Sequence, residues 1–142
     1  MQVRELMNTN VVSITPEEST ALAARLIARH NIGSLPVCSD NGQLRGVVTD
    51  RDIVLRCIAA EEDPAKTPVR NIMSRSLTFI SPEEDIRAAS HLMSEHQIRR
   101  LPVVESGKVV GMLSLGDLAS CHHCDMEASR ALSEISENIR RP

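Results

Sequence analysis

The sequence predicts an α+β fold built from two copies of one β-α-β-β-α unit, followed by an extra C-terminal helix. Three observations support this fold class. A shift of 66 residues aligns residues 3–37 with 69–103 and places the same residue at 14 of those 35 positions. Within each copy, short stretches typical of strands alternate with stretches of helical periodicity. After the second copy, a further apolar stripe at helical spacing predicts one more helix.

The repeat continues beyond the ungapped stretch. A one-residue deletion in a turn then aligns Gly46 with Gly111 and Asp52 with Asp117. We therefore divide the chain into a first repeat at 1–60, a linker at 61–68, a second repeat at 69–122 and a helical extension at 123–142. The charged, proline-bearing linker sequence is EEDPAKTP. Two repeats are too few for a solenoid, so the two units must pack against each other.

Each repeat is expected to begin with a strand and a helix. VVSI (11–14) and LTFI (77–80) are short strand candidates. TPEES and SPEED follow them, and we expect Thr15 or Ser81 as the N-cap, a proline at the first helical position, and Glu18 or Glu84 completing a capping box. The helices then carry apolar residues at helical spacing, namely Leu22, Ala23, Leu26 and Ile27 in the first repeat and Ala88, Ala89, Leu92 and Met93 in the second.

The second half of each repeat predicts a hairpin and a short helix. SLPVCS and RLPVVE are strands, DNGQ and ESGK are hairpin turns, and LRGVVT and VVGMLS are the returning strands. A second helix should begin near Asp50 and near Leu115. In the C-terminal extension, the stripe that predicts an amphipathic helix consists of Ala128, Leu132, Ile135 and Ile139.

Composition excludes several function classes. The chain has 142 residues with 42% apolar and 25% charged residues, which favours a folded domain over disorder. Its formal net charge of −3 provides no broad basic surface for nucleic acid. Phe79 is the only aromatic residue, so nucleobases cannot be held on a row of aromatic rings. Because the sequence contains no membrane-spanning apolar run and no signal peptide, we expect a cytoplasmic protein without membrane or nucleic-acid partners.

The sequence also lacks the usual signatures of catalysis. It has no nucleophile with a neighbouring base, no P-loop and no pair of catalytic carboxylates. A threonine and a serine stand at equivalent places in the two repeats, which argues against a single catalytic nucleophile. We therefore expect a protein that is not an enzyme.

One duplicated motif points to ligand binding. Gly46-Val-Val-Thr49-x-x-Asp52 returns as Gly111-Met-Leu-Ser114-x-x-Asp117. A hydroxyl and a carboxylate one helical turn apart face the same way, and an ionised carboxylate can accept bonds from both hydroxyls of a ribose. The same spacing also forms a helix capping box. The duplicated context favours ligand binding, and one carboxylate can serve both roles.

Two adjacent arginines distinguish the repeats. Arg99 and Arg100 precede the Leu-Pro-Val of the second repeat, where the first repeat has Gly33 and Ser34. Guanidinium groups form bidentate, charge-assisted bonds with phosphate oxygens. The alternative is a solvated pair at the start of a strand. We prefer phosphate recognition because apolar residues flank the pair on both sides.

Cysteine and histidine supply the rival hypothesis. Cys121 and Cys124 are spaced i and i+3, so on a helix they could donate two thiolates to a metal that needs two further ligands. We assign no metal site, and a metal or thiol sensor remains the alternative function. His30 and His96 end matching helices, where the helix dipole favours them, and we interpret both as structural.

The pattern resembles a tandem pair of CBS domains, which are named after cystathionine β-synthase. The paired SLPV…GVVTDRD and RLPV…GMLSLGD blocks and the TPEES and SPEED segments carry this resemblance over nearly all of residues 1–120. It implies two units paired through their sheets around a pseudo-twofold, and a homodimer of such pairs. It also implies an energy-sensing regulatory role in which AMP, ADP or ATP binds between the repeats, without a prosthetic group, and controls an effector protein that the sequence does not name.

The resemblance further implies that each cleft combines residues from both repeats. The first expected cleft contains Thr49, Asp52, Leu77, Thr78, Ile98, Arg99, Arg100, Leu101 and Pro102. The second contains Val11, Ile32, Ser34, Pro36, Ser114 and Asp117. Since only the first cleft has the two arginines, we expect it to bind nucleotide more tightly.

Overall fold

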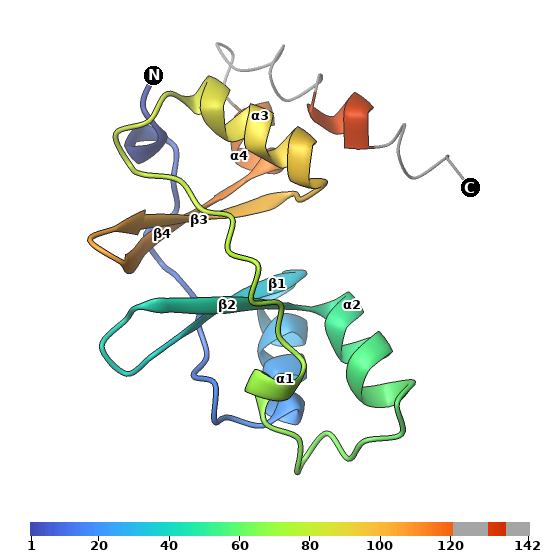
Figure 1. Cartoon of the computed structure of the whole chain (residues 1–142). Coiled ribbons are helices and arrows are strands. Elements are labelled where there is room, and N and C mark those ends of the chain that lie inside the picture. Colours follow the sequence, from blue (N-terminus) through green and yellow to red (C-terminus); the bar gives the residue numbers. More distant parts are fainter. Residues whose placement is uncertain (121–130, 136–142) are drawn as a thin grey trace. The chain divides into compact units, whose positions relative to one another are not determined.

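The computed structural model describes residues 1–120 and 131–135. Figure 1 shows its helices and strands in the order that the sequence predicts, with two hairpins each flanked by helices. The elements of the first repeat are the 3-10 helix η1 (Val3–Glu5), α1 (Thr20–His30), β1 (Ser34–Cys38), β2 (Leu44–Thr49), α2 (Asp50–Ile53) and the π-helical turn η2 (Val54–Ile58). Those of the second are the 3-10 helix η3 (Val69–Asn71), α3 (Ile86–His96), β3 (Arg100–Glu105), β4 (Lys108–Ser114) and α4 (Leu115–Ala119).

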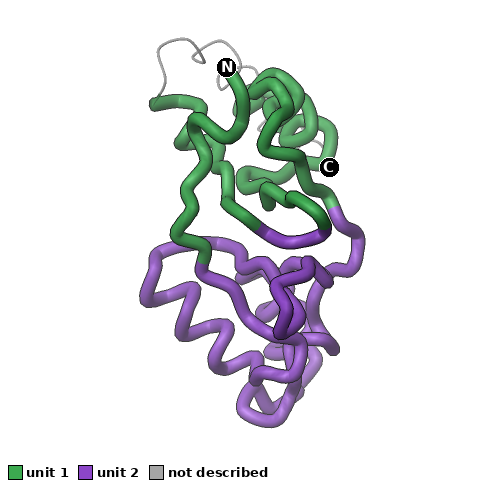
Figure 2. Tube along the Cα trace, turned by 90° about the vertical axis from the view of Figure 1, so that its left-hand side faces the viewer, with its two compact units in different colours: residues 1–11, 78–106, 110–142 green, residues 12–77, 107–109 purple. Residues whose placement is uncertain are grey.

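The chain folds into two compact units (Figure 2). The first-repeat unit comprises Val12–Leu77 and Gly107–Val109. Among the described residues, the second-repeat unit comprises Met1–Val11, Thr78–Ser106, 110–120 and 131–135. The leading segment of each sequence repeat therefore belongs to the unit formed by the other repeat.

Backbone hydrogen bonds explain this exchange of leading segments. The Val3 amide donates to the Glu84 carbonyl, and the Val69 amide donates to the Glu18 carbonyl, with N···O distances of 2.9 and 2.8 Å. Val3 and Val69 are both fully buried in these positions. An apolar residue at the same place in each leading segment thus anchors that segment in the core of a unit.

The helix starts differ from the sequence prediction. α1 begins at Thr20 with Ser19 as its N-cap, and α3 begins at Ile86 with Asp85 as its N-cap, so the expected caps Thr15 and Ser81 are wrong. The proline segments form tight turns instead, closed by amide-to-carbonyl bonds from Glu18 to Thr15 and from Glu84 to Ser81, each 3.2 Å. Their carbonyl groups accept bonds from the leading segments. This long-range pairing favours the turn over an earlier helix start.

The expected strands at 11–14 and 77–80 are reduced to single bridges. Ile14 pairs in parallel with Val37 on the edge of β1 that faces away from β2, and Ile80 pairs in the same way with Val103. The neighbouring residues of β1 and β3 are Pro36 and Pro102. Proline has no amide hydrogen, so the parallel ladder cannot extend to the residues before Ile14 and Ile80.

The repeated His-x-Ile phrase ends each long helix. His30 and His96 are the last helical residues, as the sequence predicts, and the next residue in each case is left-handed, with φ of 52° at Asn31 and 57° at Gln97. In the first repeat, the Ile32 amide then donates to the Ile27 carbonyl at 3.1 Å. This bond and the left-handed residue before it are typical of a Schellman motif, which turns the chain sharply into the residues before Leu-Pro-Val.

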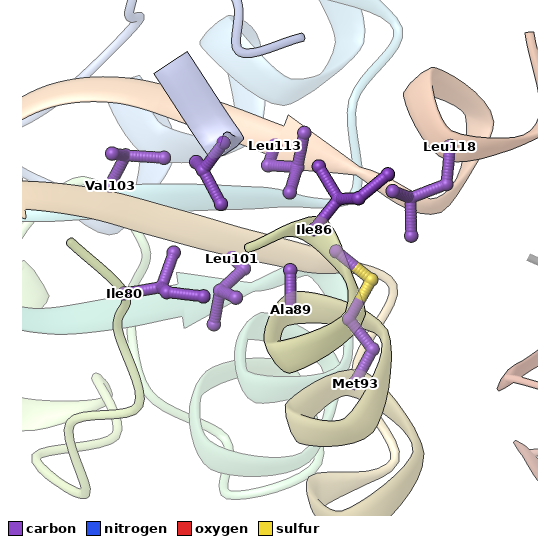
Figure 3. Close-up of a cluster of buried hydrophobic side chains, with 9 residues drawn as sticks. Ile80, Ile86, Ala89, Met93, Leu101, Val103, Leu113 and Leu118 are labelled. Carbon is purple, nitrogen blue, oxygen red and sulfur yellow. The ribbon is translucent and has the colours of Figure 1, made fainter. Parts of the chain in front are cut away.

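Each unit has its own apolar core. Figure 3 shows the core of the second-repeat unit, where side chains from α3, β3, β4 and α4 converge. Leu101, Met93 and Leu113 have no exposed surface there. The first-repeat unit has an equivalent core that includes Leu35 and Val48. The buried faces of the long helices match the apolar spacing in the sequence.

The C-terminal extension is described only at residues 131–135, which are helical. Ile135 is buried, as the predicted stripe requires, but Leu132 is 47% exposed and Ala131 is buried in its place. The other stripe residues, Ala128 and Ile139, lie outside the described residues. None of the helices within the described ranges is long and apolar enough to span a bilayer.

Candidate functional site

Thr49 and Asp52 form a helix capping box at the junction of β2 and α2. The Asp52 amide donates to Thr49 Oγ1 at 3.0 Å, and the Thr49 amide donates to Asp52 Oδ2 at 2.9 Å. The capping interpretation of this motif is therefore confirmed. Both side chains are only partly buried, so the box lies at the surface of the first-repeat unit.

Ser114 and Asp117 form the same box at the junction of β4 and α4. The Asp117 amide donates to Ser114 Oγ at 3.0 Å, and the Ser114 amide donates to Asp117 Oδ2 at 2.8 Å. Each box therefore fixes a carboxylate by one of its two oxygens. The two hydroxyl hydrogens and Asp117 Oδ1 form no hydrogen bond with the described residues, which leaves them available to a ligand.

Arg56 is a residue of this site that the sequence interpretation missed. Its Nη1 lies 3.8 Å from Asp52 Oδ1 and donates to the carbonyls of Ile72 and Met73 at 3.0 and 3.3 Å. The Asp52 side chain is only 14% exposed, whereas that of Arg56 is 52% exposed. The spacing of four residues between Asp52 and Arg56 was the available signal. The aligned position in the second repeat is Cys121, so Asp117 has no equivalent arginine in the sequence.

Gly33 and Arg99 occupy equivalent places next to the two boxes. The Asp50 amide donates to the Gly33 carbonyl at 3.0 Å, and the Leu115 amide donates to the Arg99 carbonyl at 2.8 Å. Each pre-strand residue is thus tied to the first turn of the short helix of its own repeat. Arg99 is exposed and Arg100 is half-buried, so neither guanidinium is enclosed in the core.

The remaining predicted site residues fall into three groups by burial. Leu77 is exposed, and the half-buried ones are Val11, Ile32, Ser34, Thr78 and Ile98. Three are buried, namely Pro36, Leu101 and Pro102. The buried residues belong to β1 and β3, so their main contribution is to place the residues before them.

The predicted clefts combine residues of both compact units. Thr49, Asp52 and Leu77 belong to the first-repeat unit, whereas Thr78, Arg99 and Arg100 belong to the second-repeat unit. Within a unit, the structure brings Ser34 opposite Thr49 in the β1–β2 register. The crossed grouping of Thr49 with the arginines stays a prediction.

The described cysteines do not form a metal site. Cys38 and Cys57 are buried free thiols, and burial raises the pKa of Cys38, although a hydrogen bond with Ser13 lowers it. A thiol that stays protonated is a poor metal ligand. No group of three potential metal ligands occurs among the described residues. Cys121 and Cys124 lie outside those residues.

Comparison with known proteins supports one family throughout. The sequence profile of the CBS domain matches residues 3–58 and 69–122. The CBS domain-containing protein YhcV of Bacillus subtilis (strain 168) is 42% identical over 138 residues, which cover 96% of this chain and 97% of YhcV. Hypoxic response protein 1 of Mycobacterium tuberculosis is 34% identical over 116 residues, which cover 82% of this chain and 81% of that protein.

Two solved structures share the fold. The crystal structure of Hypoxic Response Protein I with two coordinated zinc ions superposes with a TM-score of 0.79 at 32% identity, covering 84% of this chain and 98% of that one. The CBS domain pair of protein MJ0100, in complex with 5-methylthioadenosine and S-adenosyl-L-methionine, gives 0.75 at 26% identity, covering 84% and 94%. With both repeats matched in sequence and in fold, the chain belongs to the CBS domain family, as a tandem pair of CBS repeats.

Proposed function

We propose that this chain is a non-enzymatic regulatory module that binds an adenine nucleotide, of the AMP, ADP and ATP class, in the cytoplasm. The duplicated capping box is the observation that carries this proposal. Each box holds a carboxylate by one oxygen at a helix start and leaves a hydroxyl hydrogen unused. A ribose offers two adjacent hydroxyls, and such a carboxylate can accept hydrogen bonds from them.

The ligands of the MJ0100 domain pair support the adenosine part of the proposal. 5-Methylthioadenosine and S-adenosyl-L-methionine share an adenosine group, and neither contains a phosphate. The preference for a phosphate therefore rests on Arg99 and Arg100 of this chain. Arginine suits phosphate because its planar fork presents two parallel N–H donors.

The proposed clefts are not equivalent. The first combines Thr49 and Asp52 with Arg99 and Arg100, and the second combines Ser114 and Asp117 with Ser34. The first cleft thus has both ribose acceptors and phosphate donors, and it binds nucleotide more tightly. Regulation follows if the ligand has a different affinity for two arrangements of the protein, since only such a difference can shift their populations.

We also propose that the protein acts as a homodimer that contacts an effector protein. Val54, Leu55 and Ile58 on η2 are 56%, 50% and 55% exposed. Apolar side chains grouped in this way on one helical turn favour self-association around a twofold, in which the same patch meets itself. Light scattering would report a mass of two chains, and a mass of one chain at all concentrations would exclude the dimer.

A second candidate function is zinc sensing through Cys121 and Cys124. The observation that favours it is the crystal structure of the relative with two coordinated zinc ions. The spacing of the two cysteines allows both thiolates to face one metal on a helix. In this alternative the clefts are structural and the ligand is a divalent cation.

One thermal-shift panel separates the two functions. We expect AMP, ADP and ATP to raise the melting temperature of the untagged protein in a concentration-dependent way, because they bind only the folded chain. 2′,3′-Dideoxy-AMP should give a much smaller shift in melting temperature, because it lacks the hydroxyls that would donate hydrogen bonds to the carboxylates. Adding zinc should change little. A shift with zinc alone, or equal shifts with AMP and its dideoxy analogue, would contradict the nucleotide proposal.

A further inference from the structure

A pocket lies in the first-repeat unit at the hairpin-turn end of β2, whereas Thr49 ends that strand at its other end. Its volume is about 560 Å³, within the range of small-molecule sites. Three arginines and two carboxylates line it, namely Arg45, Arg70, Arg75, Glu17 and Asp40. None of these residues belongs to the clefts proposed above, so the pocket is independent of the proposed function.

The backbone around this pocket is held by hydrogen bonds. The segment before Arg75 is fixed to β2 by reciprocal bonds between Val47 and Ser74, of 3.0 and 2.8 Å. The Arg70 amide donates to the Pro16 carbonyl at 2.9 Å. The Arg45 side chain projects from β2 itself. The three guanidinium groups are therefore carried by backbone of defined position, which lowers the cost of gathering them around a ligand.

Within residues 1–120 and 131–135, no side chain pairs with any of the three arginines. Arg45, Arg70 and Arg75 are exposed, and none forms an ion pair or a side-chain hydrogen bond with the described residues. Glu17 and Asp40 line the same pocket without pairing with them. Cations gathered in a pocket without a paired carboxylate repel one another, and a bound anion relieves that repulsion.

The other repeat shows that the fold does not need this cluster. The residues aligned with Arg45 and Arg75 are Val110 and Thr9. The residue aligned with Arg70 is Arg4, and its Nη2 forms an ion pair with Glu83 Oε1 at 2.5 Å. The second-repeat unit therefore builds the same backbone with a single arginine that is already paired.

We propose that the pocket binds the phosphate group of a small phosphorylated sugar. Three guanidinium groups suit a doubly charged tetrahedral phosphate better than a singly charged carboxylate. Glu17 and Asp40 can accept hydrogen bonds from sugar hydroxyls, and so can the oxygen of Ser39, whose own hydrogen is donated to Asn41 Oδ1. No aromatic ring lines the pocket, so it offers no platform for a nucleobase.

Isothermal titration calorimetry at low salt tests the proposal. We expect saturable binding of glucose 6-phosphate, at least tenfold weaker binding of inorganic phosphate, and no binding of glucose. An Arg45→Gln, Arg75→Gln variant should bind glucose 6-phosphate at least tenfold more weakly, because it loses charge-assisted hydrogen bonds. The matched control is Arg25→Gln, Arg29→Gln, which removes the same charge from exposed positions of α1 and should bind as the unmodified chain does.

The outcomes distinguish this site from the nucleotide clefts. Arg45→Gln, Arg75→Gln should leave AMP affinity unchanged, and Arg99→Ala, Arg100→Ala should leave glucose 6-phosphate affinity unchanged. If only AMP binding fails, the proposed nucleotide function is contradicted, while the sugar-phosphate proposal for this pocket stands. The pocket proposal is overturned if the sugar phosphate gives no saturable heat, if the α1 control weakens binding equally, or if loss of Arg99 and Arg100 abolishes it. Circular dichroism of each variant checks that it is folded.

Discussion

An Arg99→Ala, Arg100→Ala double variant is expected to bind AMP about 100-fold more weakly than the unmodified chain. Each arginine would donate charge-assisted hydrogen bonds to the phosphate, and two such contributions together amount to about 3 kcal/mol. Both side chains lie outside the cores, Arg99 exposed and Arg100 half-buried, so their removal should leave the fold intact. Calorimetric titration measures the change.

Adenosine supplies the internal control for this variant. Adenosine has the ribose hydroxyls that would donate hydrogen bonds to Asp52, but it has no phosphate group for the arginines to bind. Its affinity should therefore be the same for the double variant and the unmodified chain. If AMP affinity does not change, or if adenosine binding falls as much as AMP binding, the arginines are not phosphate ligands.

The converse substitution should create a second strong site. A Gly33→Arg, Ser34→Arg variant places two arginines where the first repeat lacks them. A Cβ atom at Gly33 would meet only Asp50 Oδ2, at 3.8 Å, so a side chain can start from this position without crowding the backbone. We expect the second cleft to bind AMP at least tenfold more tightly, since it gains the phosphate donors. The calorimetric stoichiometry should then approach two tight sites per chain, and an unchanged stoichiometry would contradict the role of these positions.

Local sequence signals predicted much of the fold. The His-x-Ile phrase, the Leu-Pro-Val strands and the two Thr/Ser-x-x-Asp boxes each encode their structure within a few residues. α1 and α3 accordingly end at His30 and His96, and both boxes are closed by hydrogen bonds. These features are set by capping and turn chemistry, which acts over one helical turn.

The errors arose where distant segments decide the structure. The Glu18 carbonyl accepts a bond from Val69, 51 residues later in the chain, and this pairing favours a turn where the sequence pattern predicts a helix start. The strands expected at 11–14 and 77–80 are reduced to one bridge each, and Pro36 and Pro102 lack the amide donors that would extend the pairing to the preceding residues. The spacing of Arg56 from Asp52 is a local signal for their ion pair, but its bonds to the Ile72 and Met73 carbonyls depend on a distant segment.

The candidate site shows the same division. The capping boxes were predictable, and their two interpretations are compatible because capping uses only one oxygen of each carboxylate. Whether Arg99 and Arg100 contact a phosphate or only solvent depends on whether the bound ligand carries a phosphate group. The ligands of the MJ0100 pair contain adenosine but no phosphate, so they support the adenosine part of the proposed ligand and do not bear on the two arginines. Recognition of the phosphate group is tested by the Arg99→Ala, Arg100→Ala variant.

Gly46→Ala is expected to lower the free energy of unfolding by about 3 kcal/mol, and Gly111→Ala by about 1 kcal/mol. Both glycines lie where a leading segment crosses the returning strand of a hairpin. A Cβ atom at Gly46 would lie 2.6 Å from the Ser74 carbonyl oxygen, which is backbone. At Gly111 it would lie 2.7 Å from Met7 Sδ, the far end of a flexible side chain, with the nearest backbone oxygen at 3.2 Å.

The pair is matched because the surrounding backbone is the same in both units. Val47 and Ser74 exchange two hydrogen bonds, and so do Met112 and Asn8, at 2.8 and 2.9 Å. At Gly111 the methionine can change its rotamer and leave that pairing intact. At Gly46 the carbonyl can move only if its bond to the Val47 amide lengthens. Urea unfolding followed by far-ultraviolet circular dichroism measures both variants, and equal destabilisation would show that the two crossings yield to the same degree.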